Sequence, residues 1–247
     1  MSAHDPLIII PDLHGHRSLL ERLINYLQRE GLLDDHRLAF LGDYVDRGPD
    51  SRGTIELVCS LVAEGHVAIA GNHDLVLSKV LDTEAIGWES WVRRWAKNYE
   101  SGVLLNYGLG HRPALGDIVG WRHMACELRE AVPASHQIFL RQLPWFIETD
   151  TFVLIHAGLE QDVSWTQQKK QLEERSSGAN GPSQLFSHVL ARSLRHPAVS
   201  KQLVSGHAST PNPVFTPERV RLDCGVDFGG PLMAWVPDRQ YYFRVAH

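Results

Sequence analysis

The sequence predicts an α/β protein with largely parallel strands that end at one common site. Five short apolar runs have the length and aliphatic content of buried strands, and amphipathic helical segments separate the first three of them. Polar side chains that can bind a metal ion follow every run. In open α/β sheets, sites form where the carboxyl ends of strands meet, so we expect these side chains to converge. The five runs are residues 7–10, 38–41, 67–70, 152–155 and 203–204.

The first 75 residues alternate between strands and helices. After the first run, leucines recur at helical spacing between residues 19 and 27, and Gly31 follows as a stop signal. Residues 51–64 carry a second helical pattern before the third run. This β-α-β-α-β order predicts parallel strands joined by right-handed crossovers.

Residues 75–150 are predicted to form a helical insertion that covers one edge of the sheet. Pro133 is expected to open a helix that runs to Leu143. A stripe of tryptophans at helical spacing is interpreted as a packed helix face. The alternative is a lid whose aromatic rings border the site and stack on a base or a phosphoaromatic group. The stripe is Trp88, Trp91 and Trp95, and Tyr107 and Trp121 could belong to the same cover.

The second half of the chain contains fewer clear signals. Residues 167–183 are polar and then rich in Gly, Asn, Pro and Ser, which predicts an exposed loop. Three segments near the end, 219–222, 232–236 and 241–245, are interpreted as short antiparallel strands. Cys224, beside the first of them, is expected to be structural.

Composition excludes several classes of function. The formal net charge of −5 and the pI near 6.3 argue against a large basic surface for duplex nucleic acid or an anionic membrane. The three cysteines form no CxxC pair, which argues against a thiolate zinc site. We see no signal peptide and no apolar run near the roughly 18 residues of a membrane span. The expected location is cytoplasmic.

The residues after the apolar runs form a mixed set of carboxylate, imidazole and amide ligands. There are too many for one small cation with open positions, so two divalent metals that share a carboxylate fit better. Two metals roughly 3.5–4 Å apart can clamp phosphoryl oxygens and activate a bridging water. The ligand types suit Mn, Fe or Zn more than Ca or Mg. The candidates are Asp12, His14, Asp43, Asn72, His73, His156 and His207.

These residues also carry a resemblance to a known family. The ordered motifs are Asp12-Leu13-His14-Gly15, Gly42-Asp43-Tyr44-Val45-Asp46-Arg47-Gly48, Gly71-Asn72-His73-Asp74, His156-Ala157-Gly158 and Gly206-His207. Their order resembles the phosphoprotein phosphatase family of calcineurin-like metallophosphoesterases. Within that family, the motifs resemble the small bacterial and phage-type branch, which includes lambda-type protein phosphatases and symmetrical diadenosine tetraphosphatases. The resemblance implies one metallophosphoesterase domain over residues 1–247. Its fold would be two central β-sheets flanked by helices, an αββα sandwich.

The resemblance also implies roles at matching positions. Asp12, His14 and Asp43 would hold the first metal, Asp43 would bridge, and Asn72, His156 and His207 would complete the second. His73 would protonate the leaving oxygen, oriented by Asp46. Arg47 and Asn72 would bind substrate, Arg47 through the planar fork of its guanidinium. Two divalent ions, Mn²⁺ before Fe or Zn, and a bridging hydroxide as the nucleophile complete the implied chemistry.

Two departures from the family pattern bear on the substrate. Asp74 replaces the Glu that is commoner in protein phosphatases, and Asp is frequent in the dinucleotide hydrolases. Phage-type members usually carry a second phosphate-binding arginine in a Trp-x-Arg segment, but Thr-Gln-Gln follows Trp165 here. Arg175 or Arg192 could serve instead, although neither lies in a matching motif. The sequence therefore assigns no residue to that role.

The leading hypothesis is a phosphatase acting on phosphomonoesters, as a serine/threonine-type protein phosphatase or on small phosphoesters. The glycine-rich residues 98–108, which resemble a segment of small bacterial protein phosphatases, favour it. The alternative is a symmetrical bis(5'-nucleosyl)-tetraphosphatase that releases ADP from diadenosine tetraphosphate. Asp74 and the Phe-Gly-Gly of segment 224–230 favour this alternative. A scaffold that has lost turnover is a third reading, supported only by the missing arginine, and a nuclease is disfavoured by Arg47 and the acidic net charge.

Overall fold

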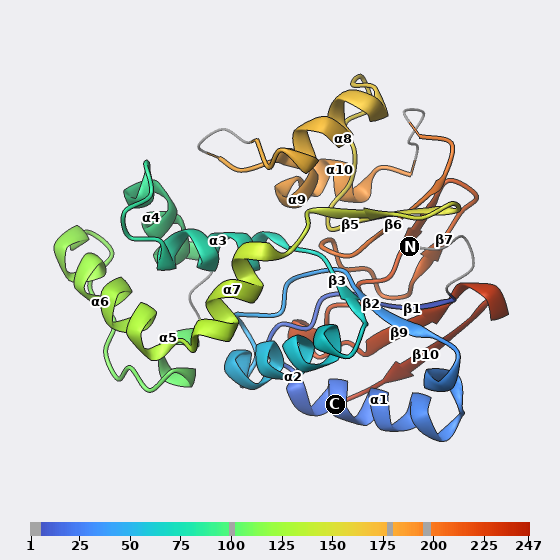
Figure 1. Ribbon diagram of the computed structural model, residues 1–247, viewed down its shortest axis with the longest axis horizontal. Helices are drawn as coiled ribbons and strands as arrows, with labels where there is room; N and C mark the ends of the chain where they lie inside the picture. Colours follow the sequence, from blue (N-terminus) through green and yellow to red (C-terminus); the bar gives the residue numbers. More distant parts are fainter. Residues whose placement is uncertain (1–5, 99–101, 177–179, 195–198) are drawn as a thin grey trace.

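Two five-stranded β-sheets pack face to face and helices cover their outer sides (Figure 1). The structure is a computed structural model that describes residues 6–98, 102–176, 180–194 and 199–247. The strand orders are β10-β9-β1-β2-β3 in the first sheet and β4-β5-β6-β8-β7 in the second. The expected sandwich of two sheets between helices is confirmed.

The first sheet is built mainly from the N-terminal third of the chain. β1 (Leu7–Ile10), β2 (Arg37–Phe40) and β3 (Val67–Ala68) are parallel, as the alternating pattern predicted. The crossovers contain α1 (Arg17–Arg29), the short η1 (Leu32–Asp34) and α2 (Ser51–Ala63). β9 (Leu232–Val236) adds antiparallel to β1, and β10 (Tyr241–Val245) pairs antiparallel with β9 across η3 (Pro237–Arg239).

The second sheet corrects one prediction. It contains β4 (Phe146–Glu148), β5 (Phe152–Ile155), β6 (Gln202–Ser205), β7 (Val214–Phe215) and β8 (Arg219–Arg221). β8 was expected to be antiparallel to its neighbours, and it is so toward β7, but it runs parallel to β6, which is parallel to β5. The expectation failed because alternation of side chains indicates a strand but not the direction in which it pairs.

The core between the sheets explains why the strands are apolar on both faces. Ile9 and Ala39 of the first sheet, and Ile69 directly after β3, share a buried cluster with Leu154 and Val204 of the second sheet. The alternate residues of the same strands point to the helices and join the larger core. The face-to-face packing brings the carboxyl ends of two sets of parallel strands to the same region.

Five helices fill the region of the predicted insertion, between β3 and β4 (Figure 1). All three tryptophans of the stripe on α4 are buried, so the packed-face interpretation is confirmed and the lid interpretation is wrong. Tyr107 and Trp121 are buried as well. The helices are α3 (Asn72–Leu81), α4 (Trp88–Asn98), α5 (Val103–Asn106), α6 (Ile118–Ala131) and α7 (Ala134–Gln142). Part of the glycine-rich segment, residues 99–101, lies outside the described residues.

Three short helices lie over the second sheet: α8 (Trp165–Glu173), α9 (Ser183–Phe186) and α10 (His188–Arg192). The loop predicted from residue 167 is therefore wrong as far as residue 173. The Ser164 side chain caps α8, and Leu172 on its inner face is fully buried. Residues 177–179 of the predicted loop lie outside the described part. None of the described helices combines the length and apolar character needed to cross a membrane.

Candidate active site

The predicted ligands lie together at the carboxyl ends of five strands, three parallel strands of the first sheet and two of the second. Asp12 and His14 follow β1, Asp43 follows β2, and Asn72 and His73 open α3 just after β3. His156 follows β5 and His207 follows β6. All of them except the deeper His156 line a pocket of about 390 Å³. The strand ends therefore converge as the sequence predicted.

The Asp43 carboxylate lies at the centre of this group. Its Oδ2 is 3.7 Å from Nε2 of His14 on one side and 3.3 Å from Nε2 of His156 on the other. Its Oδ1 accepts a hydrogen bond from the His73 amide at 2.9 Å. One carboxylate oxygen therefore faces both candidate metal positions, which is the geometry that a bridging ligand requires.

Backbone carbonyls fix the histidine tautomers that metal binding needs. Nδ1 of His156 lies 2.8 Å from the Leu41 carbonyl oxygen, and Nδ1 of His14 lies 3.0 Å from that of Val45. Because Nδ1 donates in both cases, Nε2 keeps its lone pair and points into the site. His156 Nε2 also lies 3.0 Å from Asn72 Oδ1 and 3.1 Å from His207 Nδ1. These three donor atoms therefore lie together beside Oδ2 of Asp43, which is 3.3 Å from His156 Nε2.

The electrostatics of the buried donors fit two divalent cations. Burial and the neighbouring Asp223 and Asp43 carboxylates raise the pKa of Asp12 well above its usual value. Such crowding of carboxylates is costly unless cations offset it. Two groups of donor atoms each have the spacing to hold a metal ion, one of His14, Asp43 and His73 and one of Asp43, His156 and His207.

The glycines of the motifs have a steric role beside the ligands. A Cβ at Gly71 would overlap Oδ1 of Asp43, and a Cβ at Gly206 would overlap Oδ1 of Asp12. Several non-glycine residues of the site also adopt left-handed backbone, a conformation that costs roughly 1–3 kcal/mol each and concentrates at functional sites. They are His14, Asp43, Asp46, Arg47 and His207, with φ between 41° and 68°.

His73 and Asp46 form a buried pair beside the candidate metal positions. His73 Nδ1 is 2.6 Å from Asp46 Oδ2, and both side chains are at most 2% exposed. With Nδ1 held by Asp46, Nε2 faces the pocket 3.9 Å from Asp43 Oδ2. This arrangement suits an imidazole that delivers a proton from Nε2 while a carboxylate stabilises its charged form.

Asp74 has a structural explanation that the sequence did not reveal. Its carboxylate accepts hydrogen bonds from the backbone amides of Asp43 at 2.6 Å, Tyr44 at 2.9 Å and Gly71 at 2.8 Å. These bonds tie the loop after β2 to the turn that opens α3. Asp74 therefore positions Asp43, the predicted bridging residue, and gives no direct information on the substrate.

Among the described residues, two arginines lie at the rim of the pocket. The Arg47 guanidinium forms an ion pair with Asp227 of η2 (Val226–Phe228) and lies 5.7 Å from the centre of the Phe228 ring. Arg192 lines the same pocket from α10. Arg175, the other candidate for the missing arginine, instead donates to the carbonyls at the end of α7. Of the two arginines that the sequence left open, only Arg192 reaches the site.

Sequence reasoning missed several residues that line the pocket. Asp223 follows β8, so the strand-end rule would have found it if β8 had been predicted to run parallel to β6. His188 stacks on the ring of His207 with centroids 4.5 Å apart, and only the tertiary structure reveals this contact. Phe228, in the Phe-Gly-Gly of segment 224–230, is 77% exposed at the rim, a position that the sequence pattern does not reveal.

Comparison with known proteins decides the family. The family model described as calcineurin-like phosphoesterase matches residues 6–244. The chain belongs to this family. Calcineurin-like phosphoesterases are metal-dependent hydrolases of phosphate esters, and the ligand geometry above agrees with that chemistry. The predicted family resemblance and the assignment as a phosphoesterase are confirmed.

Relatives within the calcineurin-like phosphoesterases differ in their named activity. The chain is 27% identical over 248 residues to an asymmetrical bis(5'-nucleosyl)-tetraphosphatase, PrpE, of a Geobacillus strain, covering 92% of this chain and 88% of the relative. It is 33% identical over 151 residues to a symmetrical bis(5'-nucleosyl)-tetraphosphatase of Ralstonia nicotianae, covering 61% of this chain and 41% of the relative. A solved putative diadenosine tetraphosphatase superposes with a TM-score of 0.63 at 20% identity, covering 98% of this chain and 93% of that one. This superposition supports the fold alone.

Proposed function

We propose that this phosphoesterase hydrolyses dinucleoside tetraphosphates with two divalent metal ions, Mn²⁺ being the metal we expect. The observation that carries the proposal is the rim of the pocket, where Arg47, Arg192 and the exposed Phe228 ring surround the candidate metal positions. A polyphosphate needs several cationic groups, and a nucleobase stacks on an exposed aromatic ring. The relatives named as tetraphosphatases agree with this choice.

In this proposal Asp12, His14 and Asp43 hold one metal, and Asp43, Asn72, His156 and His207 hold the other. Two bound divalent ions would supply a nucleophile at neutral pH and clamp phosphoryl oxygens. His73 then protonates the leaving phosphate oxygen from Nε2, and Asp46 holds the imidazole in orientation. Arg47 and Arg192 bind the non-bridging oxygens as charge develops on them.

A substrate panel tests the proposal: diadenosine tetraphosphate, phosphoserine and phosphotyrosine peptides, and p-nitrophenyl phosphate, each with added Mn²⁺. We expect the highest kcat/KM for the dinucleotide. ADP as the only product would indicate symmetrical cleavage, and ATP with AMP would indicate asymmetrical cleavage. Faster turnover of phosphoserine peptides would overturn the proposal in favour of the phosphoprotein substrate that the motifs favour.

Matched variants distinguish the contribution of the rim arginine Arg192 to substrate binding from that of the metal positions. Arg192→Gln should raise KM for diadenosine tetraphosphate several-fold while changing p-nitrophenyl phosphate hydrolysis less, because the smaller ester carries one phosphate. Arg175→Gln is the control, since that side chain binds backbone carbonyls of α7. Equal effects of the two substitutions on KM would contradict the assignment of Arg192.

A further inference from the structure

Within the part of the chain that the structure describes, no strand pairs with the outer edge of β10 in the first sheet. β10 is the terminal strand of that sheet, so one of its edges faces away from β9. An open edge presents backbone N–H and C=O groups that another strand can pair with, and proteins usually protect it with Lys, Pro or a bulge. β10 reads Tyr-Tyr-Phe-Arg-Val and keeps unbroken register with β9 over five residue pairs. The strand contains no Lys, Pro or bulge, and its single charged residue is Arg244.

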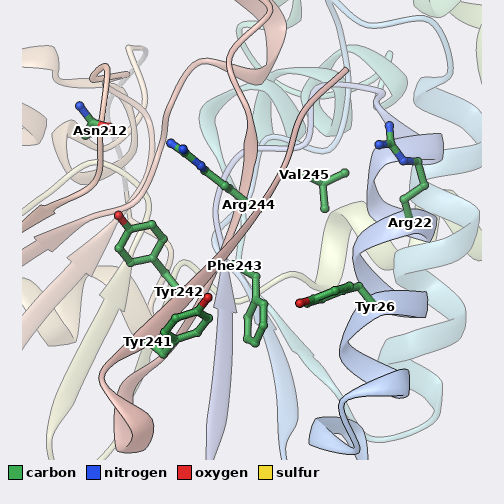
Figure 2. A pocket seen from close by; sticks show the side chains of 8 residues that line it. All are labelled: Arg22, Tyr26, Asn212, Tyr241, Tyr242, Phe243, Arg244 and Val245. Carbon is green, nitrogen blue, oxygen red and sulfur yellow. The ribbon is translucent and has the colours of Figure 1, made fainter.

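A groove of about 770 Å³ is lined by all five residues of β10 together with Arg22, Tyr26 and Asn212, and Figure 2 shows these side chains. Tyr241 and Phe243 lie on one side of β10 with Tyr26 of α1, and Tyr242 and Arg244 lie on the other side. Tyr241 is 56% exposed and Tyr242 39% exposed. A small ligand would meet only one of these faces. An added β-strand would meet both, so the groove fits an extended chain.

Three exposed residues along α1 and at its end lie beside the start, middle and end of β10. Arg22 and Tyr26 of α1 and Glu30, the residue that caps its end, are all exposed and follow one another at a spacing of four residues. The Tyr26 ring lies 5.2 Å from that of Phe243, the middle residue of β10. Arg22 donates to the Ala246 carbonyl beyond one end of β10, and Glu30 lines a pocket with Tyr241 at the other end.

We propose that β10 pairs antiparallel with β10 of a second copy of this chain, about a two-fold axis at Phe243. A two-fold contact must be self-complementary. In this register Tyr242 faces Arg244 of the second copy, so the two arginines are not opposed. Along α1, Arg22 faces Glu30 of the second copy, and symmetry repeats this contact.

The spacing of helices across the axis is consistent with the pairing. α1 packs on both β9 and β10. Because neighbouring strands lie about 4.8 Å apart, the two copies of α1 would lie about 10 Å apart. Helices pack at interaxial distances of about 8–10 Å, so the helices meet without a gap or a clash. The result is a continuous ten-stranded sheet, twice the five strands of one copy.

The proposal does not depend on the proposed substrate. The groove at β10 and the pocket of the candidate active site share no lining residue. Variants at Arg22 and Glu30 should therefore leave hydrolysis of p-nitrophenyl phosphate unchanged, which also shows that they fold.

Analytical ultracentrifugation of the full chain tests the pairing through a charge swap. We expect the wild type to dimerise, and Glu30→Arg or Arg22→Glu each to lower the association constant roughly tenfold, since each contact occurs twice. The double variant Arg22→Glu/Glu30→Arg should restore dimerisation. Glu130→Arg, an exposed residue of α6, is the control and should have no effect. Hydrogen exchange of the β10 amides should slow with protein concentration.

Three results would overturn the proposal. The first is a wild-type chain that stays monomeric at every concentration tested. The second is a dimer whose association constant does not respond to the single charge reversals, or is not restored by the swap. The third is a dimer in which exchange of the β10 amides is independent of concentration, which would place the interface elsewhere.

Discussion

The pair of Asp46 and His73 allows a quantitative test of the proposed proton donor. The variant Asp46→Asn keeps an oxygen that can accept from Nδ1 of His73, but it removes the negative charge. The native contact is 2.6 Å long and both side chains are at most 2% exposed, so solvent screens it little. A hydrogen bond to a charged group is worth roughly 1.5–3 kcal/mol, against roughly 0.5–1.5 for a neutral one.

The difference of about 1–2 kcal/mol is the stabilisation that the protonated form of His73 loses in the variant. Less of the enzyme then carries the proton that His73 donates, which corresponds to a fall in kcat of roughly 5–30-fold. We expect this fall for phenyl phosphate, whose leaving group needs a proton. The fall should be much smaller for p-nitrophenyl phosphate, whose leaving group is a weak base. Steady-state kinetics on the two esters and metal analysis of the purified variant are the measurements.

Asp50→Asn is the matched control. Asp50 caps α2 through a hydrogen bond from the Gly53 amide, and Asn caps helices equally well. It should leave both kcat values unchanged. Equal losses on the two esters for Asp46→Asn would refute a role through the leaving group. A loss of bound metal would show instead that Asp46 supports the metal ligands.

Three further predictions follow from the packing and charges. Asp43→Asn should abolish turnover and lower the occupancy of both metals by metal analysis; loss of only one metal would contradict the bridging assignment. Gly71→Ala should lower kcat more than tenfold, because the added Cβ would displace the Asp43 carboxylate. Normal activity of this variant would show that the backbone at residue 71 can shift without moving Asp43. The pKa of Glu148 is the basis of the third prediction. Burial acts to raise this pKa, but ion pairs with Lys169 and Lys201 lower it to about 2. The resulting stability is therefore present above the unfolded pKa of roughly 4.3 and is lost as pH falls toward 2. Glu148→Gln should cost about 1 kcal/mol at neutral pH by chemical denaturation, and a difference that persists unchanged at acid pH would argue against the ion pairs.

The sequence by itself determined the first three parallel strands and the convergence of the candidate ligands. Both signals are local: an apolar run marks a buried strand, and a ligand directly after it must lie at the strand end. The tryptophan stripe on α4 was likewise predicted as a packed face, since its spacing matches the helical repeat. Such inferences need no knowledge of what the element packs against.

Only the tertiary structure decided what depends on pairing between distant segments. The direction of β8 brings Asp223 to the pocket, and no periodicity along residues 219–222 encodes that direction. Arg192 reaches the pocket and Arg175 does not because the chain path places α10, and not the end of α8, beside His207. Side-chain patterns report which residues are buried, whereas the partners of a strand or an arginine are fixed by the packing of the whole chain.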